Sequence, residues 1–106
     1  MARVVITAPA DADTAEILDY LERKAGRDTA ARYSRSFEKL YERLADHPDS
    51  GAPRPAFGRH MRIGLVLPYV VIYRHDRAGD VVAVIRVLHG SRKVTRRMLQ
   101  QPPAHP

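Results

Sequence analysis

Residues 61–88 contain three consecutive runs of β-prone residues, and this feature limits the possible folds more than any other in the chain. The runs cover 61–66, 68–74 and 81–88, and a turn before Val81 joins the last two, with Gly79 expected to take the positive φ angle. The last run is apolar on both faces in its middle, which is typical of a strand with neighbours on both sides. We therefore predict an antiparallel meander with residues 81–88 in the centre of the sheet.

Two amphipathic helices are predicted before these strands. The first begins at Asp11 or Asp13, because Asp13 and Glu16 match a capping box, and it ends at Gly26. The second opens near Asp28 and carries an apolar stripe made of Ala30, Tyr33, Phe37, Leu40, Tyr41 and Leu44. Because only two or three residues separate the helices, we expect an antiparallel helical hairpin whose apolar stripe packs on the sheet.

The order of elements predicts an α+β fold, in which an antiparallel β-sheet packs against an N-terminal α-helical hairpin (β-α-α-β-β-β). Residues 2–7 form the first strand, either beside the last strand or at an edge, and the Pro- and Gly-rich segment 48–58 is a loop. We expect one domain over 1–99 and a disordered tail over 100–106. The lack of a signal peptide or an apolar span predicts a cytoplasmic protein with no membrane association, and the absence of cysteine excludes disulfides.

Positive charge is concentrated in the C-terminal half. Residues 1–53 carry eight Lys/Arg against ten Asp/Glu, a net of −2, whereas 54–106 carry ten against two, a net of +8. An arginine-rich proteome would explain the composition alone, but the asymmetry favours a surface for polyanions or for an acidic protein. The residues predicted to form this target-binding surface are Arg59, Arg62, Arg86, His89, Arg92, Lys93, Arg96 and Arg97.

Three segments resemble the ParE-type toxins of the RelE/ParE superfamily, from bacterial toxin–antitoxin pairs. They are the helix end and loop at 44–51, the strand Tyr69-Val70-Val71-Ile72-Tyr73-Arg74, and the ending Val84-Ile85-Arg86-Val87-Leu88-His89-Gly90-Ser91-Arg92. The last segment is very similar to the family pattern in which an apolar residue precedes R-V-L-H-G-x-R. The three segments occur in the expected order and spacing on a β-α-α-β-β-β frame, and the resemblance as a whole covers about residues 3–99.

This resemblance implies a specific function. ParE-like toxins trap DNA gyrase in its DNA-cleaved state, act without turnover, and are neutralised by a ParD-like antitoxin that covers part of the toxin. A hetero-oligomer with the antitoxin and indirect contact with gyrase-bound DNA are therefore expected. An acidic, amphipathic antitoxin segment would suit the basic residues. The expected antitoxin contacts are Leu18, Leu21, Tyr41, Arg62, Arg86 and Arg92.

The alternative is a RelE-like, ribosome-dependent mRNA endonuclease, which would use Arg62, Arg86, His89 and Arg92. Cleaving RNA requires a base, an acid and cations on the phosphate, and His89 can supply only one of the two proton transfers. RelE-like nucleases usually carry a tyrosine or an equivalent polar group near the C-terminal end, whereas no tyrosine follows Tyr73 here. No glutamate follows Glu42 either, so a carboxylate base would have to come from Asp76, Asp80 or the helices, and the nuclease set is incomplete. The nuclease therefore remains the second choice.

Structural roles also remain open for two of these residues. His89 before Gly90 would serve as the cap of a strand, and Arg86 would either face solvent or pair with Glu38 or Glu42, because a buried unpaired guanidinium is too costly. No histidine spacing indicates a metal and no glycine-rich loop indicates a nucleotide, so we expect no metal and no cofactor. A general nucleic-acid-binding module is a third, weaker interpretation.

Overall fold

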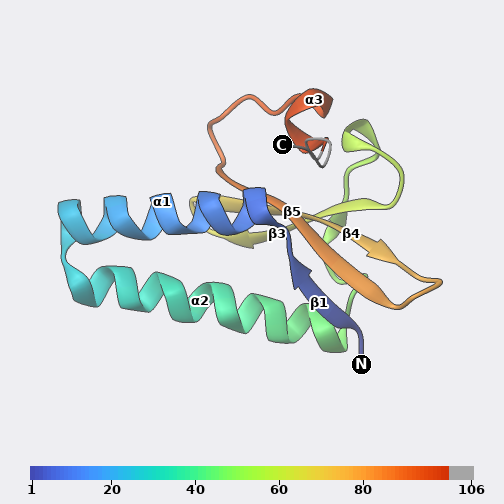
Figure 1. The fold of residues 1–106 in the computed structure, drawn as a ribbon, viewed down its shortest axis with the longest axis horizontal. Helices are drawn as coiled ribbons and strands as arrows, with labels where there is room; N and C mark the ends of the chain where they lie inside the picture. Colours follow the sequence, from blue (N-terminus) through green and yellow to red (C-terminus); the bar gives the residue numbers. More distant parts are fainter. Residues whose placement is uncertain (101–106) are drawn as a thin grey trace, which may run out of the picture.

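A computed structural model describes residues 1–100 of the 106-residue chain. Figure 1 shows a helical hairpin lying across a sheet, with a short C-terminal helix on the opposite side. The predicted tail at 100–106 lies outside the described residues, except for Gln100. The elements in chain order are β1 (Arg3–Ile6), α1 (Ala8–Ala25), α2 (Arg27–Asp46), β2 (Ala52–Pro53), the 3₁₀ turn η1 (Pro55–Phe57), β3 (Met61–Val66), β4 (Tyr69–Asp76), β5 (Val81–His89) and α3 (Arg96–Leu99).

The five strands form one sheet in the order β1-β5-β4-β3-β2. β2 through β5 pair antiparallel, and β1 pairs parallel to β5 with Arg3 opposite Val81 and Ile6 opposite Val84. The central position of β5 and the α+β class are therefore confirmed. The first strand satisfies both placements left open by the sequence, because it lies beside the last strand and at the edge.

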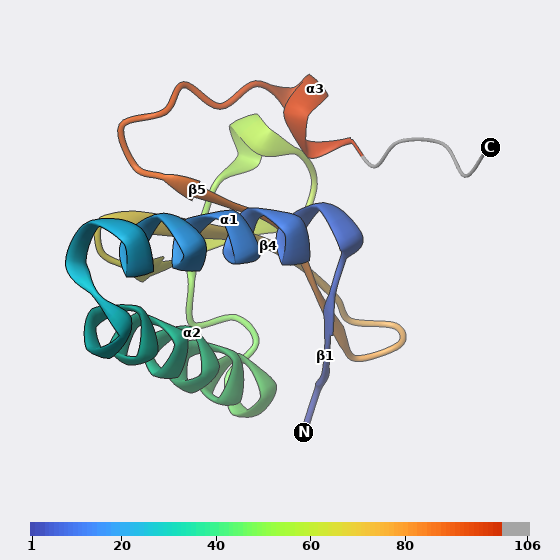
Figure 2. The same cartoon turned by 60° about the vertical axis from the view of Figure 1, so that its left-hand side comes forward.

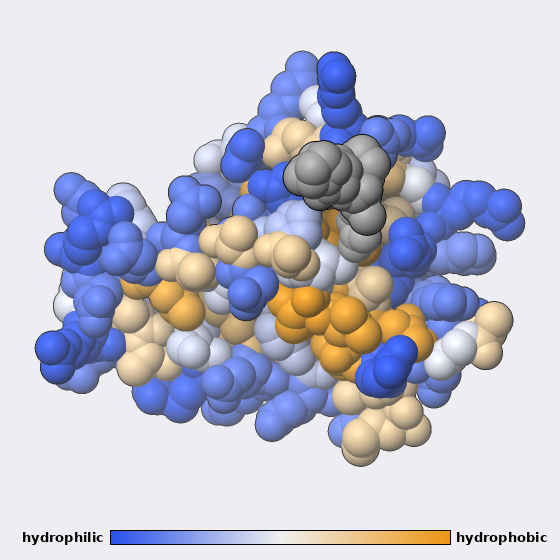
Figure 3. Space-filling view, in the orientation of Figure 1, coloured by the Kyte–Doolittle hydropathy of each residue, from blue (hydrophilic) through white to orange (hydrophobic). Residues whose placement is uncertain are grey.

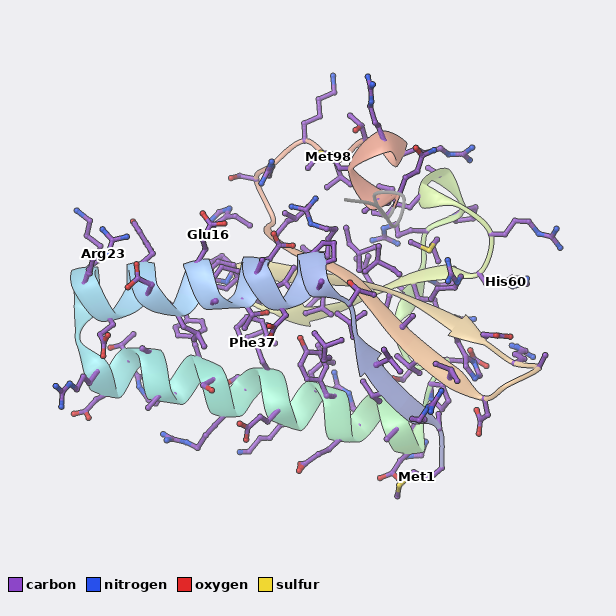
Figure 4. The ribbon with its side chains drawn as sticks, in the orientation of Figure 1. Met1, Glu16, Arg23, Phe37, His60 and Met98 are labelled. Atoms are coloured by element: carbon purple, nitrogen blue, oxygen red, sulfur yellow. The ribbon has the colours of Figure 1, made fainter. Side chains whose placement is uncertain are left out.

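The sheet has a core on each face. The helical hairpin covers one face, where Phe37, Leu40 and Leu44 of α2 pack on Val71, Tyr73, Val82, Val84 and Val87. Figure 2 shows both helices on this side, and in Figure 4 the side chain of Phe37 lies between them. On the opposite face α3 and η1 cover a second cluster formed by Met61, Ile72, Ile85, Leu88 and Leu99. The outer surface is mostly polar, and the apolar surface in Figure 3 gathers over β1 and β5, where Val5 is 39% exposed.

The start of α1 differs from the prediction. Thr7, not Asp11 or Asp13, is the N-cap, and its hydroxyl accepts from the Ala10 N–H at 3.4 Å while donating to the Val84 carbonyl at 2.8 Å. The cap therefore depends on β5, which a local pattern does not reveal. Gly26, at φ +94°, ends α1 and directly precedes α2, so one residue joins the two predicted helices.

Two further predictions are corrected at the turns. Asp80, at φ +49°, takes the left-handed conformation that was expected of Gly79, because its side chain is held by a bond to His75. The segment 48–58 is not a continuous loop, since it contains the two-residue strand β2 and the turn η1. Both short elements lie against β3, which places this segment at the edge of the sheet opposite β1.

Candidate functional site

The end of β5 and the segment after it form an exposed basic surface. His89, Arg92, Lys93 and Arg97 are exposed there, and Arg59 is exposed in the loop before β3. Within residues 1–100 none of these five side chains forms an ion pair with a carboxylate. We call these five residues the basic end. Their charges remain available to an external anion or acidic protein.

Arg86, also predicted to belong to this surface, points elsewhere. The β4–β5 register shifts between Ile72, opposite Arg86, and Tyr73, opposite Val84, so Ile85 has no partner. Arg86 pairs with Asp13 of α1 through two bonds, from Nε at 2.6 Å and from Nη2 at 2.9 Å.

The Asp13–Arg86 pair corrects the expectation that Glu38 or Glu42 would neutralise Arg86. The two side chains are only 10% and 19% exposed, and Asp13 also accepts from the Val87 N–H at 2.9 Å. Arg86 donates further to the Met98 carbonyl of α3 at 3.1 Å. The bonds and charge of Asp13, opposed by burial, raise the pKa of Arg86. This pair therefore joins α1, β5 and α3, and Arg86 is not exposed like the basic end.

Arg62 and Arg96 hold the segment before β3 in place. Arg62 donates to the Asp49 carbonyl at 2.8 Å and the Gly51 carbonyl at 2.7 Å, and its Nε lies 3.5 Å from the Asp49 carboxylate. Arg96 of α3 donates to the Ala56 carbonyl at 2.8 Å. Both remain predicted contacts for a partner, but each already has internal acceptors.

Three clefts lie beside the basic end. One of them, of about 320 Å³, is lined by the acids Asp13 and Glu16 as well as by His89 and Arg92. The other two are lined by basic side chains without an acid. One, of about 280 Å³, is bordered by four basic side chains, namely Arg59, His60, Arg62 and Arg96; Figure 4 labels His60 in its loop. The other, of about 240 Å³, has an apolar floor that includes Val70 and Leu88, with Arg54, His89 and Arg92 around it. Arg54 was not among the predicted site residues. The signal in the sequence was its position between Pro53 and Pro55, at the start of the basic half.

The hydrogen bonds of His89 define its tautomer. Its Nδ1 accepts from the Ser91 backbone N–H at 3.0 Å and lies 2.7 Å from the Ser91 hydroxyl, and its ring packs edge-on against Tyr69 at 5.8 Å. A backbone N–H is always a donor, so Nδ1 is an acceptor and the neutral ring carries its proton on Nε2. In this state His89 can donate a hydrogen bond to a partner, but neither ring nitrogen has a free lone pair to act as a base.

A polar cluster that the sequence did not indicate lies at the other end of β4. His75 is buried between two carboxylates, with Nδ1 2.8 Å from Asp49 and Nε2 3.1 Å from Asp80. Burial lowers the pKa of His75, but the bonds and charges of both carboxylates outweigh it and leave the pKa raised. Arg62 and Arg77 also approach Asp49. The cluster fastens the 47–51 loop to the β4–β5 hairpin rather than presenting a free reactive group.

The apolar residues predicted to contact an antitoxin lie within the helical hairpin. Leu21 and Tyr41 pack partly buried against the helix-side core, and Leu18 is half-buried on α1. The Tyr41 hydroxyl is buried without a hydrogen-bond partner among the described residues, and burial raises its pKa. These residues support the packing of the two helices, and their contact with a partner stays a prediction.

Residues 1–100 contain neither a metal-binding cluster nor a membrane-spanning helix. No group of three or more His, Cys, Asp or Glu side chains is arranged to hold a metal ion in this part of the chain. None of the helices in the described region is long and apolar enough to cross a membrane.

Comparison with solved structures identifies the fold. The chromosomal ParDE system of P. aeruginosa matches with a TM-score of 0.69 and 21% identity, over 84% of this chain and 96% of that one. The RelBE2 complex of Mycobacterium tuberculosis matches with a TM-score of 0.60 and 22% identity, over 83% of this chain and 96% of that one. At these identities the two structures establish a shared fold alone.

Sequence comparisons are more specific. The chain is 37% identical over 82 residues to Toxin ParE1 of Caulobacter vibrioides, a match that covers 77% of this chain and 82% of that toxin. The family model of the ParE toxin of the type II toxin–antitoxin system, parDE, matches residues 4–94. With nearly its whole folded region matched, the chain belongs to the ParE family of toxins from type II toxin–antitoxin systems.

Proposed function

We propose that this toxin acts in the cytoplasm on DNA gyrase, stabilises the complex of gyrase with cleaved DNA, and is neutralised by a ParD-like antitoxin. It acts by binding, without turnover. The basic end supplies the charges that face gyrase or the DNA that gyrase holds. Exposed, unpaired cations of this kind give fast, salt-sensitive association with a negatively charged surface.

The observation that carries this proposal is the state of the two residues a nuclease would need most. Arg86 is engaged by Asp13, and His89 has its Nδ1 occupied by the Ser91 N–H. RNA cleavage would require a general base together with cations on the scissile phosphate. The geometry therefore supports a binding surface better than a catalytic centre.

A gyrase cleavage assay tests the proposal. Purified gyrase, ATP and supercoiled plasmid are incubated with the toxin freed of its antitoxin, and the products are examined after detergent and protease treatment. We expect linear DNA to accumulate in proportion to the toxin bound. A Val84→Asp variant is the control, because it buries an unpaired charge in the core and removes the folded surface.

The opposite result would point to the RelE-like activity. If a folded sample that arrests growth produces no linear DNA, the gyrase proposal is wrong. Cleavage of mRNA on purified ribosomes by the same sample would then assign the function to the cleft formed with Arg54, His89 and Arg92. A toxin that acts by binding should affect no more gyrase molecules than there are toxin molecules. An enzyme would instead process many substrate molecules for each toxin molecule.

A further inference from the structure

A separate groove lies between α2 and the β3–β4 turn, away from the basic end. Its volume is about 430 Å³. We call it the α2 groove, and its lining residues are Arg32, Tyr33, Arg35, Ser36, Lys39, Val66 and Leu67. These residues belong to α2, to the end of β3 and to the turn that follows, none of which contributes to the basic end.

One wall of the α2 groove is cationic. Arg32, Arg35 and Lys39 lie three and four residues apart, so their side chains share one face of α2. All three are exposed, and none forms an ion pair within residues 1–100. Arg32 donates only to the neighbouring Thr29 hydroxyl, at 3.3 Å. Asp28, Glu38 and Glu42 lie within one helical turn of these cations, but among the described residues none of these acids forms an ion pair with Arg32, Arg35 or Lys39. The three cations repel one another at this spacing, so an acidic occupant would be favoured.

The opposite wall and the floor are apolar. Leu67 is 73% exposed at the tip of the β3–β4 turn, and Val66 beside it is buried. Tyr33 packs edge-on against Tyr69 at 5.8 Å, which fixes its ring at the base of the groove. An exposed leucine beside a row of cations favours a partner with apolar as well as acidic side chains. This combination favours a protein segment over the sugar-phosphate backbone of DNA, which lacks such apolar groups.

We infer that the α2 groove binds an acidic, amphipathic segment of the antitoxin, with carboxylates on the cationic wall and an apolar side chain on Leu67. The inference rests on the proposed function for the identity of the partner. It also relocates the acidic contact expected from the sequence, because two of the three arginines assigned to it, Arg62 and Arg86, have internal partners. Charge complementarity at the groove would speed association with the antitoxin and increase its sensitivity to salt.

The test separates neutralisation from toxicity. The triple variant Arg32→Glu/Arg35→Glu/Lys39→Glu reverses the cationic wall without touching the core, and Leu67→Ser removes the apolar contact. The matched control is Arg23→Glu/Lys24→Glu/Arg27→Glu, which makes the same change in charge near the tip of the hairpin; Figure 4 shows Arg23 on the outer side of α1. Each variant is co-expressed with the cognate antitoxin, and growth and the Kd of the purified complex are measured.

We expect the triple variant to arrest growth alone, to escape neutralisation, and to bind the antitoxin at least about tenfold more weakly than the control does. Leu67→Ser should weaken binding without altering its salt dependence. Equal neutralisation and equal Kd for the triple variant and the control would overturn the inference.

The comparison of Kd values for the antitoxin does not depend on whether gyrase is the target. If the unaltered toxin fails to arrest growth, the proposed function fails, but the Kd values still decide whether the antitoxin occupies the α2 groove. A duplex oligonucleotide is the second probe. If the triple variant loses binding to the duplex while its Kd for the antitoxin is unchanged, the groove is a DNA contact and the inference is wrong.

Discussion

At the scale of single residues, the Asp13–Arg86 ion pair connects three elements of the fold. Asp13 accepts two bonds from Arg86 and one from the Val87 N–H, and Arg86 also reaches the Met98 carbonyl of α3. A helix, the central strand and the C-terminal segment are therefore coupled through two side chains. Removing one partner leaves the other charge poorly solvated, which costs more than the pair itself contributes.

We expect Asp13→Ala to lower the free energy of unfolding by about 3 kcal/mol, because it leaves the guanidinium of Arg86 without its carboxylate. Urea titration followed by circular dichroism measures the change, with Asp11→Ala, an exposed acid on the same helix, as the control. The double variant Asp13→Leu/Arg86→Met should recover much of the loss. A loss for Asp13→Ala as small as for Asp11→Ala would mean that the pair does not stabilise the fold.

His75 should give the toxin a pH-dependent stability. The pKa of His75 is raised above its usual 6.5 in the folded state, since the carboxylates of Asp49 and Asp80 outweigh its burial. Its contribution to stability is therefore complete below about pH 6.5 and is lost as the pH rises through the folded pKa. The pKa of Asp49 is lowered, chiefly by its bond to His75, so the carboxylate stays charged until the solution is strongly acidic.

Unfolding free energies measured from pH 5 to pH 9 test this prediction. The difference between the wild type and His75→Gln should shrink above pH 7, whereas His47→Gln, at an exposed site on the helix end, should follow the wild type throughout. A His75→Gln difference that is constant over this range would show that the ring is not held as a cation.

The basic end is exposed as the sequence indicated, and its contact with a target stays a prediction. The sequence did not reveal the roles of Asp13, Arg54 or His75. Charged residues that follow the end of a strand are expected at the surface, so the exposure of residues 89–93 could be predicted from the sequence. Asp13 pairs with a residue 73 positions away, and it was assigned to a local capping pattern that fits the sequence equally well. The role of His75 depends on Asp49, which a loop brings to it from 26 positions away.

At the scale of elements, the strands and helices follow their sequence patterns, and the departures come from tertiary contacts. β3 matches its predicted bounds, β4 covers Tyr69–Asp76 where 68–74 was predicted, and β5 extends one residue beyond its predicted end. α1 begins earlier than predicted because Thr7 bonds to Val84 on β5. The 47–53 segment is likewise ordered by a side chain from β4, since the Tyr73 hydroxyl accepts from the Gly51 N–H at 2.9 Å and donates to the Pro48 carbonyl at 2.8 Å.

The variant Gly51→Ala tests how tightly Tyr73 holds the 47–53 segment. A methyl group at this position would overlap the Ile63 carbonyl and lie 2.5 Å from the Tyr73 hydroxyl, so the loop must shift away from β4. We expect the free energy of unfolding to fall by about 1–3 kcal/mol, as in other overpacked sites. Thermal unfolding measures the loss, and Gly79→Ala, where the nearest atom is 3.6 Å away, serves as the comparison. Equal stability of the two variants would contradict the tight fit at Gly51.

At the scale of the whole molecule, the charges separate into two surfaces. The basic end lies after β5, and the α2 groove lies on the helical hairpin and the β3–β4 turn. The overall fold was predictable from the order of elements. The α2 groove was not predictable, because the N-terminal half has a net negative charge. That net charge gives no indication that three unpaired cations share one face of α2.

We expect Arg92→Ala/Lys93→Ala to weaken growth arrest without changing the melting temperature, because both side chains are exposed and lie beyond β5. The control Arg23→Ala/Lys24→Ala removes the same amount of charge from the outer surface of α1 and should retain full toxicity. Growth after induction, with the amount of folded protein matched, measures the difference. Full toxicity of the Arg92/Lys93 variant would exclude the basic end as the working surface.

The parallel pairing of β1 with β5 also affects how the toxin is made. β1 is synthesised before the helical hairpin and strands β2, β3 and β4, but its partner β5, with Arg3 opposite Val81, follows only after them. Contacts between such distant residues form slowly because a long loop must close before they contribute any stability. A nascent chain that lacks β5 therefore has neither a closed sheet nor the basic end. The chain therefore gains its closed sheet and its basic end in the same stage of synthesis, once β5 has been made, which gives the antitoxin until that moment to be present.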